Sequence, residues 1–226
     1  MGSPEQTGAS ASSGLPEAVP DGNPARAAAA GLERLQSGRP EPQMRADARR
    51  NYDRLLAAAW EAFAERGSDD VSLEEIARRA GVGIGTLYRH FPNRQSLLEA
   101  VYRDQVLALG GRAAKLLAAE SPEDALAEWL RDLVSFSSTK RSLTKELLAS
   151  LDSEQSFLPV CKAVIRQSTS AILERAQQVG VVRADVTGSD LIRLAHGMVM
   201  ASDMAPGDAG QLDRMLSVIM AGLVTA

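Results

Sequence analysis

Residues 72–92, SLEEIARRAGVGIGTLYRHFP, decide the fold, because they predict two short helices joined by a tight turn. Ser72 can cap the first helix by accepting a backbone N–H, and Glu75 completes a capping-box pattern. Gly81 follows where a helix end favours a residue that tolerates positive φ. One apolar face of the first helix is formed by Leu73, Ile76, Ala77 and Ala80. The pattern predicts a helix-turn-helix, a motif whose second helix enters the DNA major groove.

Residues 81–101, GVGIGTLYRHFPNRQSLLEAV, resemble the recognition-helix signature of the TetR family of transcriptional regulators. The matching positions are Thr86, Leu87, Tyr88, His90, Phe91, Asn93, Arg94, Leu97 and Leu98. The preceding helix resembles the family pattern through Leu55, Ala59, Phe63 and Gly67. The specific resemblance covers residues 48–101. It implies an all-α fold, with an N-terminal three-helix DNA-binding domain and a C-terminal helical domain for ligand binding and dimerisation.

Composition agrees with a helical protein that binds DNA through a few placed side chains. Aromatic residues make up only 4% of the 226 residues, Ala and Leu are frequent, and alternating strand patterns are absent. The net charge is −4. Residues 45–103 carry ten arginines against nine acidic residues, so bulk charge cannot provide the affinity for DNA.

Several classes of protein are disfavoured by what the sequence lacks. Cys161 is the only cysteine, so no intrachain disulfide or cysteine-based metal cluster is expected. No apolar run approaches the roughly 18 residues that span a bilayer, and the N-terminus lacks a signal-peptide hydrophobic region. The two histidines lie in different units, and no phosphate loop or catalytic triad pattern is present. We expect a cytoplasmic protein that is not an enzyme, with no metal, no cofactor and no membrane partner.

The chain divides into three predicted parts: a solvated tail over residues 1–44, the DNA-binding domain over 45–92, and an effector-binding and dimerisation domain over 93–226. The tail is rich in Pro, Gly, Ser, Ala and Gln, and burial could not offset its chain entropy. Residues 25–35 have only marginal helix potential because they are short and contain Gly31. Alternatively, the end of the tail is an arm that reaches the minor groove or phosphates with Arg39, Arg45, Arg49 and Arg50.

The direction of Leu87 predicts which residues face DNA. It is the large apolar residue at the centre of the second helix and must point inward, so its neighbours face the groove or its walls: Ile84, Gly85, Thr86, Tyr88 and Arg89. Ile84 can contact a thymine methyl group, and Arg89 can form a bidentate pair with guanine. Because Ile84 and Gly85 offer no hydrogen bonds, Arg49, Arg50, Thr86, Arg89 or the shape of the DNA must supply the rest of the readout.

The phosphate contacts come partly from the resemblance. It implies that Tyr88 and His90 form a phosphate-contacting pair and that Arg94 is a cationic phosphate contact. Ser72 lies where a helix N-terminus can meet a phosphate. Two simpler interpretations remain open: His90 closes a local core contact, and Arg89 is a solvated surface charge.

The second half of the chain predicts a series of helices. A linking helix spans residues 94–109 and ends or bends at Gly110 and Gly111. In the resemblance, its motion changes the spacing of two recognition helices. Ser121-Pro122-Glu123-Asp124 has the pattern of a helix start. Further helices are expected over residues 125–138, 143–151, 157–179, 190–202 and 211–224.

The last two helices are expected to form a dimer interface. Their apolar positions include Leu191, Leu194, Met198, Leu212, Met215, Leu216, Ile219 and Met220. The resemblance implies a four-helix bundle across a two-fold axis, which suits an operator with two half-sites. The alternative is that these helices only close the core of the monomer.

The resemblance also implies a ligand pocket between the middle helices. Candidates for its wall are Trp129, Leu133, Phe136, Phe157, Val164, His196 and Met200, each of which could instead be plain core. The leading hypothesis is a repressor that binds a palindromic DNA operator as a homodimer and is released by a small-molecule effector. The second hypothesis is a DNA-binding regulator with no small-molecule effector, constitutive or controlled by a protein.

Overall fold

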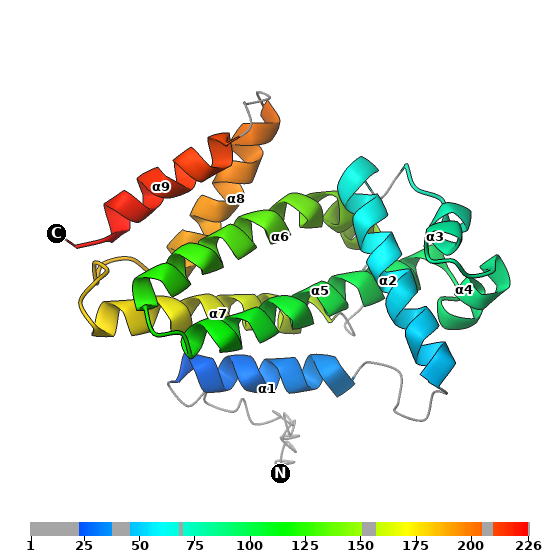
Figure 1. Cartoon of the computed structure of the whole chain (residues 1–226), viewed down its shortest axis with the longest axis horizontal. Coiled ribbons are helices and arrows are strands. Elements are labelled where there is room, and N and C mark those ends of the chain that lie inside the picture. Colours follow the sequence, from blue (N-terminus) through cyan, green and yellow to red (C-terminus); the bar gives the residue numbers. More distant parts are fainter. Residues whose placement is uncertain (1–22, 38–45, 68–69, 151–156, 205–209, 226) are drawn as a thin grey trace, which may run out of the picture.

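A computed structural model describes residues 23–37, 46–67, 70–150, 157–204 and 210–225, and these ranges are almost entirely helical (Figure 1). The helices are α1 Pro24–Ser37, α2 Ala46–Arg66, α3 Leu73–Arg79, α4 Ile84–His90, α5 Arg94–Leu117, α6 Pro122–Ser150, α7 Leu158–Gln178, α8 Gly188–Met204 and α9 Gln211–Leu223. Within the described ranges, the β structure is one isolated antiparallel bridge between Val182 and Val224. The predicted all-α fold is confirmed. None of the described helices is both long and apolar enough to cross a membrane.

Helices α2, α3 and α4 form a small unit at one end of the molecule (Figure 1). Its core contains fully buried Leu55, Phe63, Ile76 and Leu87, which hold the three helices together. Helix α2 ends at Arg66, and Gly67 follows it at φ 82°. Gly81 has φ 66° in the turn between α3 and α4, where a side chain would strain the backbone.

Helices α5 and α6 are longer than the sequence predicts. Helix α5 continues through Gly110 and Gly111 to Leu117, so the expected end or bend at these glycines is wrong. The reason is packing, because Gly110 is buried where Leu32 of α1 contacts it. Helix α6 has a continuous helical backbone from Pro122 to Ser150, in place of two expected helices. Helix α5 thus runs from the α2–α4 unit into the larger unit as one rod.

The prediction that residues 1–44 form a solvated tail is wrong for residues 24–37, which form α1. Figure 1 shows α1 alongside α5 and α7, and it packs against both helices. The buried residues of α1 are Ala28, Gly31 and Leu35. This short helix is stabilised by tertiary packing, which local propensity could not reveal. The rest of the predicted tail lies outside the described residues, apart from Asn23.

Helices α8 and α9 lie at the opposite edge of the larger unit from α1, and both contact α6 (Figure 1). The C-terminus is tied to the segment before α8 by two backbone hydrogen bonds. Arg183 N donates to the Leu223 carbonyl at 3.0 Å, and Thr225 N donates to the Val181 carbonyl at 3.1 Å. These bonds fix the end of α9 to the body of the protein.

Candidate nucleic-acid interface and associated surfaces

Helix α4 presents apolar and polar side chains outward from a buried anchor. Leu87 is fully buried, as predicted, while Ile84 is 37% exposed and Tyr88 is 46% exposed. Gly85 and Arg89 are also exposed, and Thr86 is half-buried. Large side chains held at the surface without burial in the protein's own core are suited to contact with a partner.

The backbone at the start of α4 is not covered by neighbouring side chains. A Cβ atom added at Gly83 or Gly85 would meet no heavy atom within 4 Å, so this end of the helix has room for close approach. Arg89 lies along the helix, because its Nε donates to the Gly85 carbonyl at 3.2 Å. Therefore α4 offers a narrow surface bordered by the longer side chains of Ile84, Tyr88 and Arg89.

His90 packs against the unit as well as facing its surface. Its ring lies 5.9 Å from the Tyr52 ring in an edge-on arrangement and 6.2 Å from the Phe91 ring. Burial, followed by the nearby Arg89 charge, lowers the pKa of His90 below its ordinary value. A neutral imidazole donates one hydrogen bond and adds no charge. The local-contact interpretation of His90 is therefore supported by its packing.

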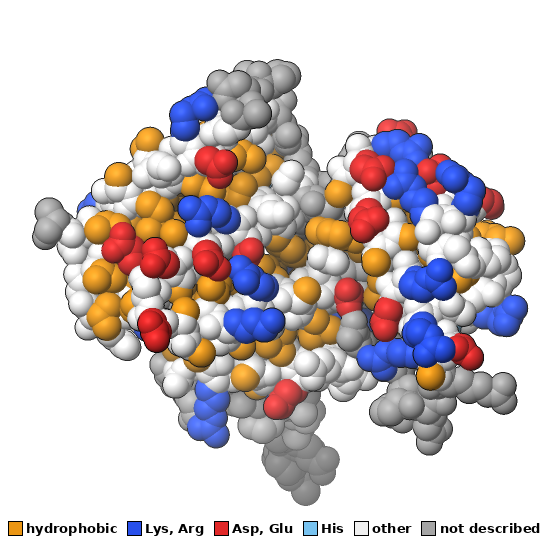
Figure 2. All heavy atoms as spheres, in the orientation of Figure 1, with side chains coloured by type: hydrophobic (Ala, Val, Ile, Leu, Met, Phe, Trp, Pro, Cys, Tyr) orange, Lys and Arg blue, Asp and Glu red, His pale blue; other side chains and the backbone are white. Residues whose placement is uncertain are grey.

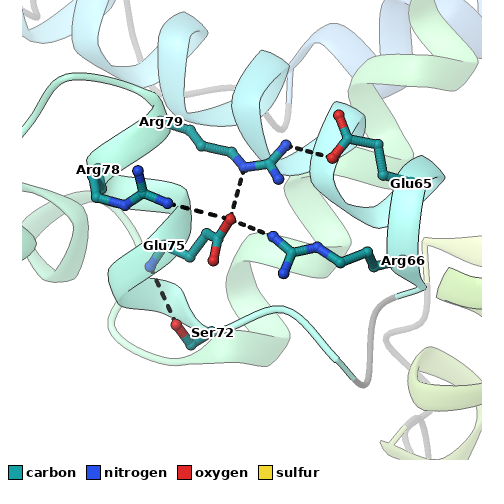
Figure 3. Close-up of polar contacts among 6 residues, drawn as sticks. All are labelled: Glu65, Arg66, Ser72, Glu75, Arg78 and Arg79. Atoms are coloured by element: carbon teal, nitrogen blue, oxygen red, sulfur yellow. Dashed lines mark hydrogen bonds and ion pairs between the residues drawn. The ribbon is translucent and has the colours of Figure 1, made fainter.

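Helix α3 is held against α2 by a cluster of ion pairs (Figure 3). Ser72 Oγ accepts a hydrogen bond from Glu75 N at 3.2 Å, which confirms its capping position. The Glu75 carboxylate does not reach back as the capping-box pattern predicts. It accepts from Arg79 Nε at 3.0 Å and from Arg66, and it lies 3.5 Å from Arg78 Nη2.

The same cluster continues to Glu65, whose carboxylate lies 2.8 Å from Arg79 Nη1. The hydrogen bond from Arg79 is the main cause that lowers the pKa of Glu75. Arg66 comes from α2 and Arg79 from α3, so Glu75 joins the end of one helix to the other. The sequence reasoning missed this cluster because it assigned Glu75 to a local cap.

Arg94 has a structural role within the protein. Its Nη1 donates to the Val71 carbonyl at 2.7 Å, and its guanidinium lies 5.7 Å from the centre of the Phe63 ring. It thereby fixes the first residue of α5 to the segment that precedes α3. The role of Arg94 as a phosphate contact, which the resemblance implies, stays a prediction beside this structural role.

Arg49 and Arg50 lie on the exposed surface at the start of α2. Arg49 pairs with Asp53 at 3.7 Å, and Arg50 pairs with Asp47. Exposed pairs of this kind contribute little to stability, so a phosphate can replace the carboxylate at small cost. Figure 2 shows Arg side chains gathered over the α2–α4 unit with acidic side chains among them, in agreement with its near-neutral charge.

The predicted dimer residues divide into two groups. Leu191, Met198 and Leu216 are buried in the subunit, whereas Leu194 is exposed and Leu212, Met215, Ile219 and Met220 are half-buried. Val218 is 73% exposed and was missed, because it lies beside Met215 outside the predicted apolar stripe of α9. A groove of about 880 Å³ lies between α8 and α9. Its lining is Asp190, Arg193, Leu194, Gly197, Met198, Gln211, Arg214, Met215, Val218 and Ile219.

The predicted pocket residues do not all lie together. Trp129, Leu133 and Val164 are buried, and Trp129 Nε1 donates to Thr169 Oγ1 at 3.1 Å. His196 and Met200 are exposed on α8, so their placement in an interior wall is wrong. The reason is helical phase, since α8 turns Leu191, Ala195 and Met198 inward instead.

Two pocket candidates meet around a tyrosine that the sequence analysis did not select. The rings of Phe136 and Phe157 lie 5.9 Å and 6.0 Å from the ring of Tyr102 on α5. Arg103 lies 5.0 Å from the centre of the Phe157 ring. Burial raises the pKa of the Tyr102 phenol above its ordinary value. This aromatic cluster joins α5, α6 and the residue that precedes α7.

Comparison with known proteins defines the class of this fold as a helix-turn-helix regulator. Residues 55–101 match the sequence profile of "Bacterial regulatory proteins, tetR family". Residues 121–225 match the profile "Transcriptional regulator SbtR-like, C-terminal domain". An HTH-type transcriptional regulator of Staphylococcus aureus strain USA300 is 43% identical over 54 residues, which cover 24% of this chain and 29% of that protein. The match thus spans less than a third of this curated relative.

Two solved structures are similar over most of the chain. A TetR transcriptional regulator from Streptomyces coelicolor is 34% identical, covers 77% of this chain and 99% of its own, and has a TM-score of 0.68. A TetR transcription regulatory protein from Mycobacterium vanbaalenii is 36% identical, with 80% and 99% coverage and a TM-score of 0.65. The chain belongs to the TetR family of transcriptional regulators. It is a DNA-binding regulator and not an enzyme.

Proposed function

We propose that this regulator is a homodimeric repressor that binds a palindromic operator and is released by a small-molecule effector. The observation that carries the proposal is the outer face of α4. Leu87 fixes the helix from inside, while Ile84 and Tyr88 stand exposed beside two glycines with open space around them. A recognition helix needs this combination of a rigid base and an accessible face.

In the complex with DNA, we assign the contacts to the bases to α4. Ile84 would contact a thymine methyl group, Thr86 would contact a base edge, and Arg89 would exchange its bond to Gly85 for guanine. Tyr88 would donate its hydroxyl hydrogen to a phosphate. The remaining backbone contacts are assigned to Ser72, His90, Arg49 and Arg50, while Arg94 positions α5 against the α2–α4 unit.

The dimer is assigned to α8 and α9. Leu194 and Val218 are large apolar side chains exposed on the two helices, and both line the groove. A second copy related by a two-fold axis would cover this groove with the same surface, which closes the assembly at two subunits. Two subunits would then present two α4 helices to half-sites about one helical turn of DNA apart.

The effector is assigned to the aromatic cluster of Tyr102, Phe136 and Phe157. A ligand that separates these rings would push on α5, the helix that also contacts α2. Because a rigid rod transmits such a displacement, ligand binding and operator binding would be linked. We place the protein in the cytoplasm, where a bacterial chromosome is accessible.

A second candidate is a regulator without a small-molecule effector. The observation in its favour is that Trp129, Leu133 and Val164 are almost fully buried by the protein's own side chains. Titration with compound libraries, followed by the fluorescence of Trp129 in a Trp60→Phe background, separates the two candidates. A compound that causes a saturable change in fluorescence and also lowers the affinity of the protein for DNA supports the small-molecule effector.

A gel-shift experiment with DNA flanking the gene for this chain tests the proposal. We expect a specific complex that survives added salt and excess unrelated DNA, with two chains per duplex by light scattering. If only weak, salt-sensitive binding is found, equal for all sequences, the proposed operator recognition is wrong.

A further inference from the structure

The surface formed by α5 and α7 carries a helix that lies outside both matched family ranges. Helix α1 precedes residues 55–101 and 121–225, and it packs against α5 and α7 at once. We propose that α1 is a brace: it docks in the α5–α7 surface, fixes these two helices relative to each other, and so stabilises the arrangement of the DNA-binding unit. Its effect on DNA affinity rests on the proposed function.

The contact on the α7 side depends on a glycine in α1. A Cβ added at Gly31 would lie 2.5 Å from Val164 Cγ2, closer than real Cβ atoms come to another heavy atom. Valine has little freedom to move away, because its side chain is restricted to one main rotamer in a helix. The two helices therefore approach each other more closely than any larger residue at Gly31 would allow.

The contact on the α5 side depends on a glycine in the other partner. A Cβ added at Gly110 would lie 2.3 Å from Leu32 Cδ2 and 3.0 Å from Leu32 Cγ. Thus both α7 and α5 meet α1 at a position where one partner has no side chain. Reciprocal contacts of this kind indicate that the surface formed by α5 and α7 is shaped to fit α1, and we call this surface the seat of α1.

Helix α1 also has an N-terminal cap and one apolar face. Asn23 Oδ1 accepts backbone hydrogen bonds from Ala25 N at 3.0 Å and Arg26 N at 3.3 Å, and Pro24 occupies the first helical position. The residues that face the seat follow one helical stripe: Ala28, Gly31, Leu32 and Leu35. A capped amphipathic helix can dock and release as a unit.

The position of α1 connects this seat to DNA binding by two routes. Through α5, the seat is joined to Arg94, which holds the Val71 carbonyl of the α2–α4 unit. Through the chain itself, only residues 38–45 separate α1 from α2, which carries Arg49 and Arg50. Any shift of α5 relative to α7 alters the seat, so docking of α1 and the α5–α7 arrangement stabilise each other.

The adjacent glycines of α5 provide a matched pair of variants for the test. Gly110→Ala places its Cβ against Leu32, whereas Gly111→Ala meets nothing within 4 Å. Both variants gain the same helix propensity, so their difference reports the contact with α1. Leu35→Ser changes only α1 and removes a buried side chain from the seat. Leu32→Ala removes the atoms that Gly110→Ala would meet.

Hydrogen exchange followed by mass spectrometry on the full chain is the first readout. We expect Gly110→Ala and Leu35→Ser to raise the exchange of α1 amides roughly tenfold, and to raise the exchange of α5 amides as well. Gly111→Ala should leave the exchange of α1 amides close to that of the unchanged protein. In a Leu32→Ala background, Gly110→Ala should have no further effect on the exchange of α1 amides. Unchanged α1 exchange in Gly110→Ala and Leu35→Ser would overturn the docked seat.

Anisotropy with a labelled duplex from the DNA flanking the gene is the second readout. We expect at least a roughly threefold change in Kd for Gly110→Ala and Leu35→Ser, and none for Gly111→Ala. Faster α1 exchange with unchanged α5 exchange and unchanged Kd would overturn the brace. If the unchanged protein forms no specific complex, the proposed function fails, while the α5 exchange still decides whether α1 is a brace.

Discussion

Val218 provides the sharpest test of the proposed dimer, because its side chain is 73% exposed on α9 and lines the α8–α9 groove. Val218→Ala removes two methyl groups in each of two symmetric subunits, and each is worth about 0.8 kcal/mol when buried. Only the 73% of Val218 that is exposed in one subunit can become buried in the dimer. The expected loss of dimerisation free energy is therefore about 2 kcal/mol, or roughly a thirtyfold rise in the dimer Kd. Sedimentation equilibrium over a dilution series measures this change.

Val218→Lys should have a larger effect, because it adds a cation beside Arg193 and Arg214 and repeats it across the two-fold axis. We expect this variant to sediment as a folded monomer with unchanged helical content. The matched control is Val179, which is 58% exposed at the end of α7 and does not line the groove. The reasoning is refuted if Val218→Lys and Val179→Lys dimerise equally well.

Three further predictions concern the α2–α4 unit. Leu87→Ala removes a fully buried side chain and should lower the free energy of unfolding by about 3 kcal/mol, measured by urea denaturation. Tyr88→Ala should weaken specific DNA binding roughly tenfold in anisotropy measurements while stability changes by less than about 0.5 kcal/mol, and a loss of stability instead would place Tyr88 in the core. Glu75→Gln should lower Tm at neutral pH. Since the folded-state pKa of Glu75 lies below its ordinary 4.5, its contribution is present above 4.5 and is lost as pH falls through the folded value. Thermal unfolding at neutral and acidic pH checks this, and a Tm difference that persists in acid would contradict it.

Local sequence signals were sufficient where short-range chemistry decides the structure. The inward direction of Leu87, the cap at Ser72 and the positive φ at Gly81 follow from spacing and residue type, and each is found. The apolar stripe of α9 was also detectable from its helical periodicity, although the exposed Val218 was not selected.

The remaining features depend on contacts between distant segments. Gly110 looked like a helix end, yet it lies inside α5 because Leu32 packs on it. Helix α1 was assigned to a tail although Asn23 and Pro24 form a start signal, because the segment is short and contains Gly31. His196 was placed inside by residue type alone, without fixing the phase of α8.

Hydroxyl-radical footprinting of the DNA flanking the gene tests the central claim most directly. With the unchanged protein, we expect two protected stretches related by a dyad, with centres about 34 Å apart along the duplex or a multiple of that spacing. At the same protein concentration, Tyr88→Ala should weaken both stretches together and Val218→Lys should abolish both, while Val179→Lys preserves them. A single protected stretch, or protection that survives in Val218→Lys, would contradict a dimer that reads DNA through paired α4 helices.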